Sequence, residues 1–326
     1  MLSENERLIS GIVFAAASFI IAAVLMALLL PVLRRLKAGQ SIREEGPQAH
    51  MIKAGTPTMG GLAIILGFVI SNIIFCIEYK DHSVFTDTAV ICLVTLLYAG
   101  IGFIDDYIKV VKKRNLGLTA IQKLALQIIV AAAVAVYSGL NYGTTISLPI
   151  LGLNADLRWL YFPFAVFVVV AMTNAVNLTD GLDGLASSVT AIVALCFAVI
   201  SRNNLSSFGA AVTLYGCCLG FLLFNHYPAK VFMGDTGSLA LGGALSAIAI
   251  ISKNEFVLPV AGIIYVIEAL SVIIQVFVFK TQNGRRFFRM APIHHHFELG
   301  GMKEKNIVIM FCAITTVFCA LEMWVA

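Results

Sequence analysis

Long apolar runs separated by short polar gaps dominate the pattern of this 326-residue chain. Ten runs approach the ~20 apolar residues that a helix needs to cross a bilayer. They cover residues 11–33, 59–77, 88–104, 119–138, 159–176, 184–201, 206–224, 236–252, 256–279 and 306–325. Residues 139–158 carry turn residues and a weak alternation, which predict a short β-hairpin. The pattern predicts an all-α integral membrane protein with about ten transmembrane helices, forming a single domain over residues 1–326.

Composition supports a membrane protein. The chain is 60% hydrophobic and 12% charged, with a mean hydropathy of +0.93. Charged residues make up about a quarter of an ordinary globular sequence. A soluble protein of this length could not bury so much apolar surface, so we expect the lipid bilayer as a partner and no nucleic acid.

The basic residues predict which gaps face the cytoplasm. Cytoplasmic loops of membrane proteins carry an excess of Lys and Arg. The gaps after odd-numbered runs, with the start of the fourth run, hold 17 of the 22 basic residues, and the remainder of the chain holds 5. This asymmetry predicts that the odd gaps are cytoplasmic and that both termini lie outside.

Two adjacent carboxylates, Asp105 and Asp106, close the third run. Adjacent acids repel each other and are costly to hold near hydrocarbon. A divalent cation or a basic partner would relieve the repulsion, and Lys109, about one helical turn later, is one candidate. An ordinary solvated helix end with an acid–base pair is the alternative interpretation.

The gap after the fifth run contains two amides and two acids but no basic residue. It reads Asn174-Ala-Val-Asn177-Leu-Thr-Asp180-Gly-Leu-Asp183-Gly. Its glycines permit tight turns. Asp183 could be the N-cap of the next helix, whereas Asp180 has no such simple structural explanation.

A glycine-rich turn, Phe232-Met-Gly-Asp235-Thr-Gly, precedes the eighth run and follows Asn225. Free amides at a helix N-terminus favour phosphate binding. The carboxylate of Asp235 would repel that phosphate unless a metal ion lies between them. A plain capped helix start is the alternative.

Two further motifs combine cations with hydrogen-bonding groups. Lys53-Ala-Gly-Thr-Pro-Thr58 could grip an anion at a Gly/Pro turn, although it lacks the order of a P-loop. Three arginines precede His294-His295-His296. Adjacent helical histidines point about 100° apart, so contacts with phosphate or sugar suit them better than one shared metal ion.

An acid inside the ninth run, Glu268, is either a functional group or part of a structural hydrogen bond.

In this order, the motifs resemble those of the polyprenyl-phosphate N-acetylhexosamine-1-phosphate transferases. The Asp-Asp and Asn-x-x-Asp-Gly-x-Asp-Gly elements are shared across that superfamily. The motifs around Lys53 and the triple histidine resemble its phospho-N-acetylmuramoyl-pentapeptide branch, which makes lipid I. The resemblance covers nearly the whole chain.

The resemblance implies an activity and its setting. Phospho-MurNAc-pentapeptide would move from UDP-MurNAc-pentapeptide to undecaprenyl phosphate, with release of UMP and dependence on Mg2+. The active site would face the cytoplasm in the inner (cytoplasmic) membrane of a bacterium, and the branch suggests a homodimer.

The resemblance also implies roles for individual residues. The catalytic set is Asp105, Asp106, Lys109, Asp183, Asp235 and His294, with the metal on Asp235. The substrate-binding set is Lys53, Thr58, Lys123, Asn177, Asp180, Asn225, Phe232, Gln275, His295 and His296.

Two rival functions and two mechanisms stay open on the sequence. The rivals are a sister transferase that uses UDP-GlcNAc and a polytopic anion transporter. A transporter would tend to place its polar groups at mid-membrane, whereas these motifs lie at the boundary. The mechanisms are direct attack by the lipid phosphate and a covalent aspartyl-phosphate route through Asp106.

Overall fold

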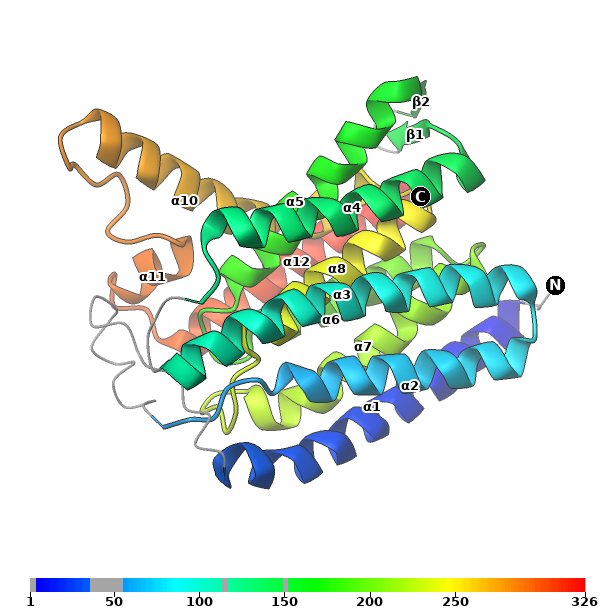
Figure 1. Cartoon of the computed structure of the whole chain (residues 1–326), viewed down its shortest axis with the longest axis horizontal. Coiled ribbons are helices and arrows are strands. Elements are labelled where there is room, and N and C mark those ends of the chain that lie inside the picture. Colours follow the sequence, from blue (N-terminus) through cyan, green and yellow to red (C-terminus); the bar gives the residue numbers. More distant parts are fainter. Residues whose placement is uncertain (1–3, 36–54, 113–116, 149–151, 326) are drawn as a thin grey trace.

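The computed structural model describes residues 4–35, 55–112, 117–148 and 152–325, and these are helical almost throughout (Figure 1). The helices are α1 Glu4–Arg35, α2 Gly61–Tyr79, α3 His82–Lys112, α4 Ala120–Tyr142, α5 Tyr161–Thr179, α6 Leu185–Ile200, α7 Leu205–Asn225, α8 Gly234–Ile251, α9 Val257–Ala261, α10 Ile263–Thr281, α11 Ile293–Glu298 and α12 Glu304–Val325, with a short 3-10 helix at Arg158–Leu160. The predicted all-α membrane architecture is confirmed.

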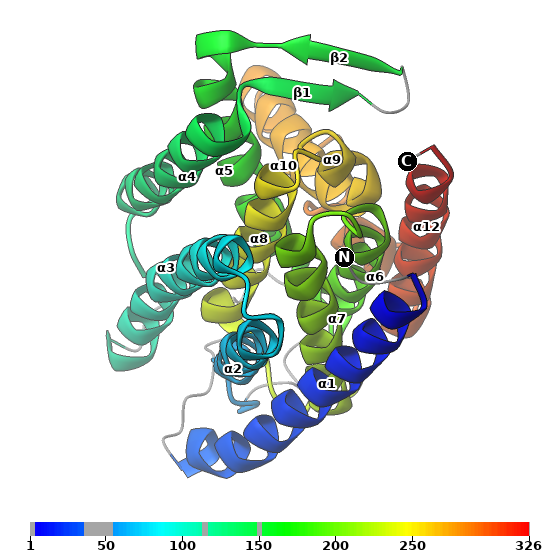
Figure 2. The ribbon, with the colours of Figure 1, turned by 90° about the vertical axis from the view of Figure 1, so that its right-hand side faces the viewer.

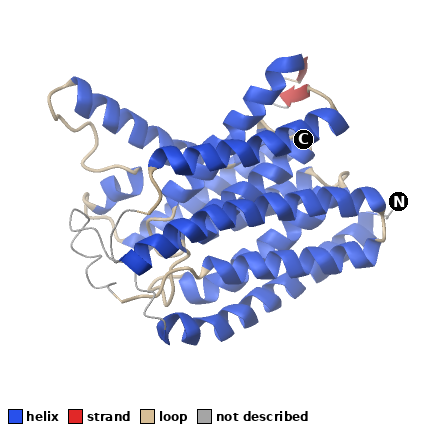
Figure 3. Cartoon of the chain, in the orientation of Figure 1, coloured by secondary structure: helices blue, strands red, loops and turns tan. Residues whose placement is uncertain are grey.

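The hairpin predicted within residues 139–158 is also present. Strands β1 Thr145–Leu148 and β2 Leu153–Asp156 pair antiparallel, with Thr145 opposite Asp156. Figure 3 shows these strands, in red, at the end of the bundle where α1 begins and α12 ends.

Nine helices of the described segments are long and apolar enough to cross a membrane. The exception among the ten predicted spans is 184–201, which forms the 16-residue α6. Sixteen residues extend about 24 Å, less than the ~30 Å of bilayer hydrocarbon. Because α6 is mostly buried and packs on α7 and α12, protein surrounds it where lipid would otherwise lie.

The predicted ninth span, 256–279, is divided into two helices. Gly262 ends α9 and precedes α10, with φ −92° and ψ 35° instead of helical values. Beyond this break α10 diverges from the bundle (Figure 1). Only 22% of the residues in its most apolar 18-residue stretch are buried. Its exposed side chains are apolar, which suits contact with lipid.

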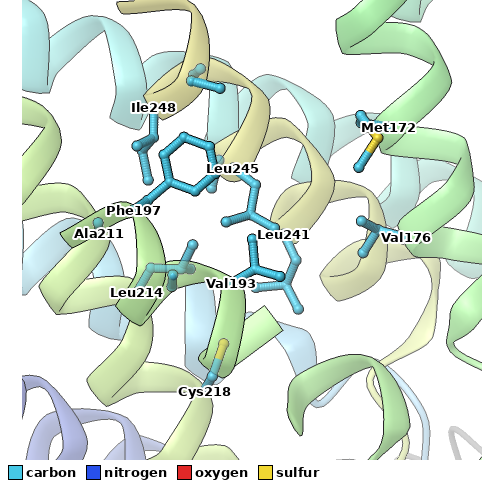
Figure 4. Packing of buried hydrophobic residues seen from close by; sticks show 14 of the residues in the cluster. Met172, Val176, Val193, Phe197, Ala211, Leu214, Cys218, Leu241, Leu245 and Ile248 are labelled. Atoms are coloured by element: carbon cyan, nitrogen blue, oxygen red, sulfur yellow. The ribbon is translucent and has the colours of Figure 1, made fainter. Parts of the chain in front are cut away.

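Helix α8 forms the centre of the bundle, and 89% of the residues in its 18-residue apolar stretch are buried. Figure 2 shows it enclosed by α3, α5, α6 and α7. Its side chains Leu241, Leu245 and Ile248 pack among residues of α5, α6 and α7 (Figure 4). In contrast, α1 lies at the periphery, and only 17% of the residues in its most apolar 18-residue stretch are buried. The apolar periphery and packed centre are those of a helical membrane bundle.

The two ends of the bundle carry different elements. Helix α1 begins, and α12 ends, at the end that bears the hairpin, whereas α11 lies at the opposite end (Figure 1). The described residues of the motifs from the odd-numbered gaps are therefore gathered at the α11 end. Which compartment each end faces stays a prediction from charge.

Candidate active site

Asp235, the second residue of α8, accepts side-chain contacts from three other helices. Its Oδ2 lies 2.9 Å from Nζ of Lys109 on α3 and 2.8 Å from Nζ of Lys123 on α4. Its Oδ1 accepts a hydrogen bond of 2.9 Å from Nδ2 of Asn177 on α5. Groups up to 126 residues apart in sequence thus converge on one carboxylate.

Asp106 holds the first turn of α8 in place. Its Oδ1 accepts from the Asp235 amide at 3.2 Å, and its Oδ2 accepts from the amide and hydroxyl of Thr236 at 2.9 and 2.7 Å. Helix N-termini leave amides without intrahelical partners. The residue before α8, Met233, provides no side-chain cap. The alternative interpretation, a capped helix start, is therefore correct in outline, but the cap comes from α3.

Asp105 takes different hydrogen-bond and ion-pair partners. Its Oδ2 lies 2.6 Å from Nζ of Lys109, and its Oδ1 accepts from the Leu118 amide at 2.8 Å. The carboxylate is only 2% exposed. The acid–base pair proposed from the sequence is present, but its acid is buried, so it is not a solvated helix end. Helix α3 continues for six residues beyond Asp106, to Lys112.

The three carboxylates form a candidate metal centre. Asp105, Asp106 and Asp235 can each offer one oxygen, and these oxygens lie within 4.8 Å of one another. Mg2+ binds oxygen ligands, usually one or two carboxylates together with substrate phosphates and water. Carboxylate oxygens from two helices fit this donor chemistry. The structure thus adds two carboxylates to the ligand predicted from the sequence, Asp235.

Asp180 and Asp183 take different positions in the turn between α5 and α6. Asp180 caps the C-terminus of α5 and is half-buried; removal from water, then repulsion by Asp235, Asp106 and Asp183, raises the pKa of its carboxyl well above the ordinary value. The Asp183 carboxylate instead accepts from the Ala229 amide at 2.9 Å.

The alternative role of Asp183 as the N-cap of α6 is wrong. Gly184 occupies that position, with no side-chain cap. The Asp183 amide donates to Glu304 Oε1 at 2.6 Å, so the turn is tied to the start of α12. Asp183 holds the connection between α7 and α8, and its catalytic role stays a prediction.

Three predicted binding residues line the approach to α8. Thr58 is buried against Gly234, whose added Cβ would lie 2.8 Å from the Thr58 hydroxyl. The Phe232 amide donates to the carbonyl of Pro57 at 2.8 Å. Asn225 donates to the Val231 carbonyl at 3.0 Å. These contacts position the start of α8, and substrate binding by these residues stays a prediction. Lys53 lies outside the described residues.

The triple histidine and Gln275 occupy the region between α10 and α12. Nδ1 of His294 lies 2.9 Å from Glu268 Oε1, and Nδ1 of His295 lies 2.7 Å from Glu298 Oε2. Nδ1 of His296 accepts from the Arg289 amide at 3.1 Å. The three rings take separate partners.

Gln275 on α10 binds the segment that leads to α11. Its Oε1 accepts from the amides of Phe287 and Phe288, at 3.1 and 2.9 Å. Its side chain therefore holds this segment against α10, and its role in substrate binding stays a prediction.

Sequence reasoning missed several residues that complete the site. Thr236 secures Asp106, and the Ser238 hydroxyl lies 2.8 Å from Asn177 Nδ2. Both follow the Gly-Asp motif on α8 and could have been included with it. Glu304 carries no comparable signal, because its contact with the Asp183 amide joins residues 121 apart.

Comparison with known proteins shows which family this chain is similar to. Residues 88–253, just over half of the chain, match the model of glycosyl transferase family 4. Residues 53–65 match signature 1 of the phospho-N-acetylmuramoyl-pentapeptide-transferases. A Bacillus subtilis protein named phospho-N-acetylmuramoyl-pentapeptide-transferase is 50% identical over 311 residues, covering 94% of this chain and 95% of the relative. The chain belongs to the phospho-N-acetylmuramoyl-pentapeptide-transferase family.

Two further relatives of that name show the same extent of similarity. The Halalkalibacterium halodurans protein is 49% identical over 319 residues, and the Geobacillus kaustophilus protein is 49% identical over 318. The alignments cover 94% and 96% of this chain, and 96% and 97% of the relatives. Membership in the phospho-N-acetylmuramoyl-pentapeptide-transferase family confirms the predicted transferase class and argues against the transporter and the UDP-GlcNAc branch.

Proposed function

We propose that the protein transfers phospho-MurNAc-pentapeptide from UDP-MurNAc-pentapeptide to undecaprenyl phosphate, giving lipid I and UMP for peptidoglycan biosynthesis. The observation that carries this proposal is the convergence of Lys109, Lys123 and Asn177 on the Asp235 carboxylate. The names of the family relatives support the same reaction. By the same resemblance, we expect the enzyme to act as a homodimer.

The position of the cluster suits the two substrates. The donor is water-soluble and anionic, and the acceptor is a phosphate on a long hydrocarbon tail. They can meet only where the membrane borders water. The excess of basic residues in the gaps after the odd-numbered runs supports a cytoplasmic site in the inner membrane of a bacterium.

Charge neutralisation is the main requirement of the reaction. Asp235, with Asp105 and Asp106, would hold Mg2+, which when bound would neutralise charge on the diphosphate and the departing UMP. Lys109 and Lys123 bring two further positive charges to the same point. Fixed cations in a site shielded from water stabilise developing negative charge strongly.

The contacts of Asp106 support direct displacement over an aspartyl-phosphate intermediate. An oxygen of the lipid phosphate attacks the sugar-linked phosphorus of the donor, and the bond from that phosphorus to the UMP oxygen breaks. The attacking monoester needs little activation, since its second pKa is about 6. Both oxygens of Asp106 already accept hydrogen bonds from the start of α8, so its attack on phosphorus would disrupt that helix end.

Product formation tests the function. Purified protein, Mg2+ and undecaprenyl phosphate are incubated with UDP-MurNAc-pentapeptide or with UDP-GlcNAc, and released UMP is measured. We expect UMP release with UDP-MurNAc-pentapeptide and none with UDP-GlcNAc. Omission of Mg2+ should abolish release, and Asp235→Asn should lower it by about 100-fold or more, the scale of losing a charge-stabilising group.

A control variant and two refuting outcomes complete this assay. Glu78 is exposed on α2 at the end away from the cluster, and Glu78→Gln should retain normal turnover. Full activity of Asp235→Asn would refute the metal assignment. A phosphosugar-labelled protein formed with donor alone would refute direct displacement.

A further inference from the structure

A glutamate–histidine pair is buried next to the proposed site. Glu268 on α10 is 0% exposed and His294 on α11 is 1% exposed. Oε1 of Glu268 lies 2.9 Å from Nδ1 of His294. Burying a carboxylate in a membrane helix is costly unless a partner satisfies it. The histidine satisfies one carboxylate oxygen, Oε1, although 26 residues separate the two in sequence, while Oε2 has no hydrogen-bond partner among the described residues.

The other nitrogen of His294 faces the turn that carries Asp180. A Cβ added to Gly181 would lie 2.1 Å from His294 Nε2 and 2.5 Å from its Cε1. Only a glycine therefore allows the ring edge to approach this turn. Nε2 is buried and has no hydrogen-bond partner within the part of the chain that the structure describes. Buried polar atoms in proteins nearly always have a hydrogen-bond partner, so Nε2 is expected to have one when the site is occupied.

The contact with Glu268 determines what Nε2 can do. A carboxylate accepts hydrogen bonds, so it favours the tautomer in which Nδ1 carries the proton. Nε2 then presents a lone pair to the Asp180–Asp183 turn. A hydroxyl or protonated phosphate oxygen of a substrate would be its complementary partner.

We propose that Glu268 is a positioning residue, which fixes the orientation and tautomer of His294 so that Nε2 accepts a hydrogen bond from a substrate O–H group. This inference rests on the proposed function for the presence of that substrate. A purely structural pair would hold α11 against α10 but would not require a particular tautomer.

The histidine tautomer gives a test that needs no activity. Protein labelled with 15N-histidine is compared with a His294→Asn variant, which identifies the His294 signals. In the unaltered protein Nδ1 should be protonated and Nε2 unprotonated. In Glu268→Leu the proton should no longer be confined to Nδ1. Protonated Nε2 in the unaltered protein would overturn the proposal.

Kinetics test the consequence for turnover. Glu268→Leu should lower kcat by about 10-fold to 100-fold, by analogy with the loss of a residue that orients a metal-bound histidine, with KM for the nucleotide donor within about twofold. Glu268→Gln keeps an oxygen that accepts from Nδ1–H and should recover most of kcat. Glu322, also buried in a membrane helix but on α12, provides the control, and Glu322→Gln should keep normal kcat.

A double variant separates positioning from structure. With His294 already replaced by Asn, adding Glu268→Leu should cost less than about twofold, because the two residues act as a unit. Additive losses, or a normal kcat for Glu268→Leu, would refute the proposal. If the unaltered protein forms no UMP, the proposed function fails instead, and the 15N measurement still decides the tautomer.

Discussion

The adjacent acids Asp105 and Asp106 have different partners because successive helical residues point about 100° apart. Asp105 contacts Lys109, one turn later on the same helix. Asp106 faces α8 and binds its first amides. The sequence predicted that their mutual repulsion would need relief, and it offered Lys109 as a partner. It could not predict the cap on α8, which depends on how two helices cross.

Asp180 gives a stability prediction with a definite sign. Its pKa is raised in the folded protein, first by burial and then by neighbouring carboxylates. The folded state therefore favours the protonated form, and ionisation destabilises it as pH rises above the ordinary value of 3.8. Asp180→Asn removes this penalty, so Tm in detergent should rise by about 2 °C or more at pH 8 and approach that of the unaltered protein near pH 4.

Asp81 provides the comparison. Hydrogen bonds from Ser83 lower the pKa of this exposed acid, so its ionised form favours the folded state above the ordinary pKa. Asp81→Asn should not raise Tm at pH 8. A lower Tm for Asp180→Asn at pH 8 would contradict the assigned repulsion.

The pairing of Glu268 shows where residue-level sequence reasoning stops. The sequence identified an acid in a membrane run and left functional and structural roles open. Its partner, His294, belongs to a motif that was identified for a different reason. The contact arises because α10 diverges from the bundle and the chain returns through α11, and no periodicity in the sequence encodes that return.

Close crossing of α3 and α8 sets the geometry of the site. Gly102 faces the first turn of α8, where an added Cβ would lie 2.1 Å from the Asp235 carbonyl oxygen and 2.6 Å from the Thr236 amide nitrogen. Both are backbone atoms and cannot rotate away. The absence of a side chain at Gly102 thus permits Asp106 to reach the α8 amides.

A matched pair of glycines on α3 tests this crossing. Gly102→Ala should lower stability by about 1–3 kcal/mol, the usual cost of overpacking, and should reduce UMP release at least about tenfold by displacing Asp235. Gly100 lies two residues away with nothing within 4 Å of an added Cβ, so Gly100→Ala should preserve Tm and activity. Equal behaviour of the two variants would show that the crossing tolerates a methyl group.

Most membrane helices follow directly from the apolar runs, and the departures have physical causes. Length alone could not reveal that α6 would be short, because its run of residues 184–201 is no shorter than the run 88–104, which forms part of the longer α3. The break at Gly262 separates α9 from α10 within one continuous apolar run. Glycine is a poor helix former, but a single glycine within a membrane run is common and does not specify a break.

The distribution of charge over the whole molecule predicts its orientation. The hairpin and the motifs occupy opposite ends of the bundle (Figure 1), and basic residues are concentrated with the motifs. The sequence could therefore predict that the motifs share one side. It could not predict which of them would touch, since that depends on helix packing.

Single cysteines placed at each end test the orientation. Gln282 follows α10 at the motif end, and Asn154 lies in the hairpin; both are exposed. In intact cells a membrane-impermeant maleimide should label Asn154→Cys, and it should label Gln282→Cys only after permeabilisation. The chain without an added cysteine measures background from the seven native, free thiols. Labelling of both variants in intact cells would reverse the assignment of sides.

With the proposed function, the extension of α3 beyond its acidic pair bears on how deep the proposed transfer takes place. Tyr107 to Lys112 add about 9 Å of helix beyond Asp106, so the carboxylates lie below the tip of α3. With the proposed function, a prenyl phosphate can react while its tail stays among the lipid chains. The nucleotide sugar is then the substrate that descends, and the lipid reaches the enzyme by lateral diffusion within its own leaflet, without extraction from the bilayer.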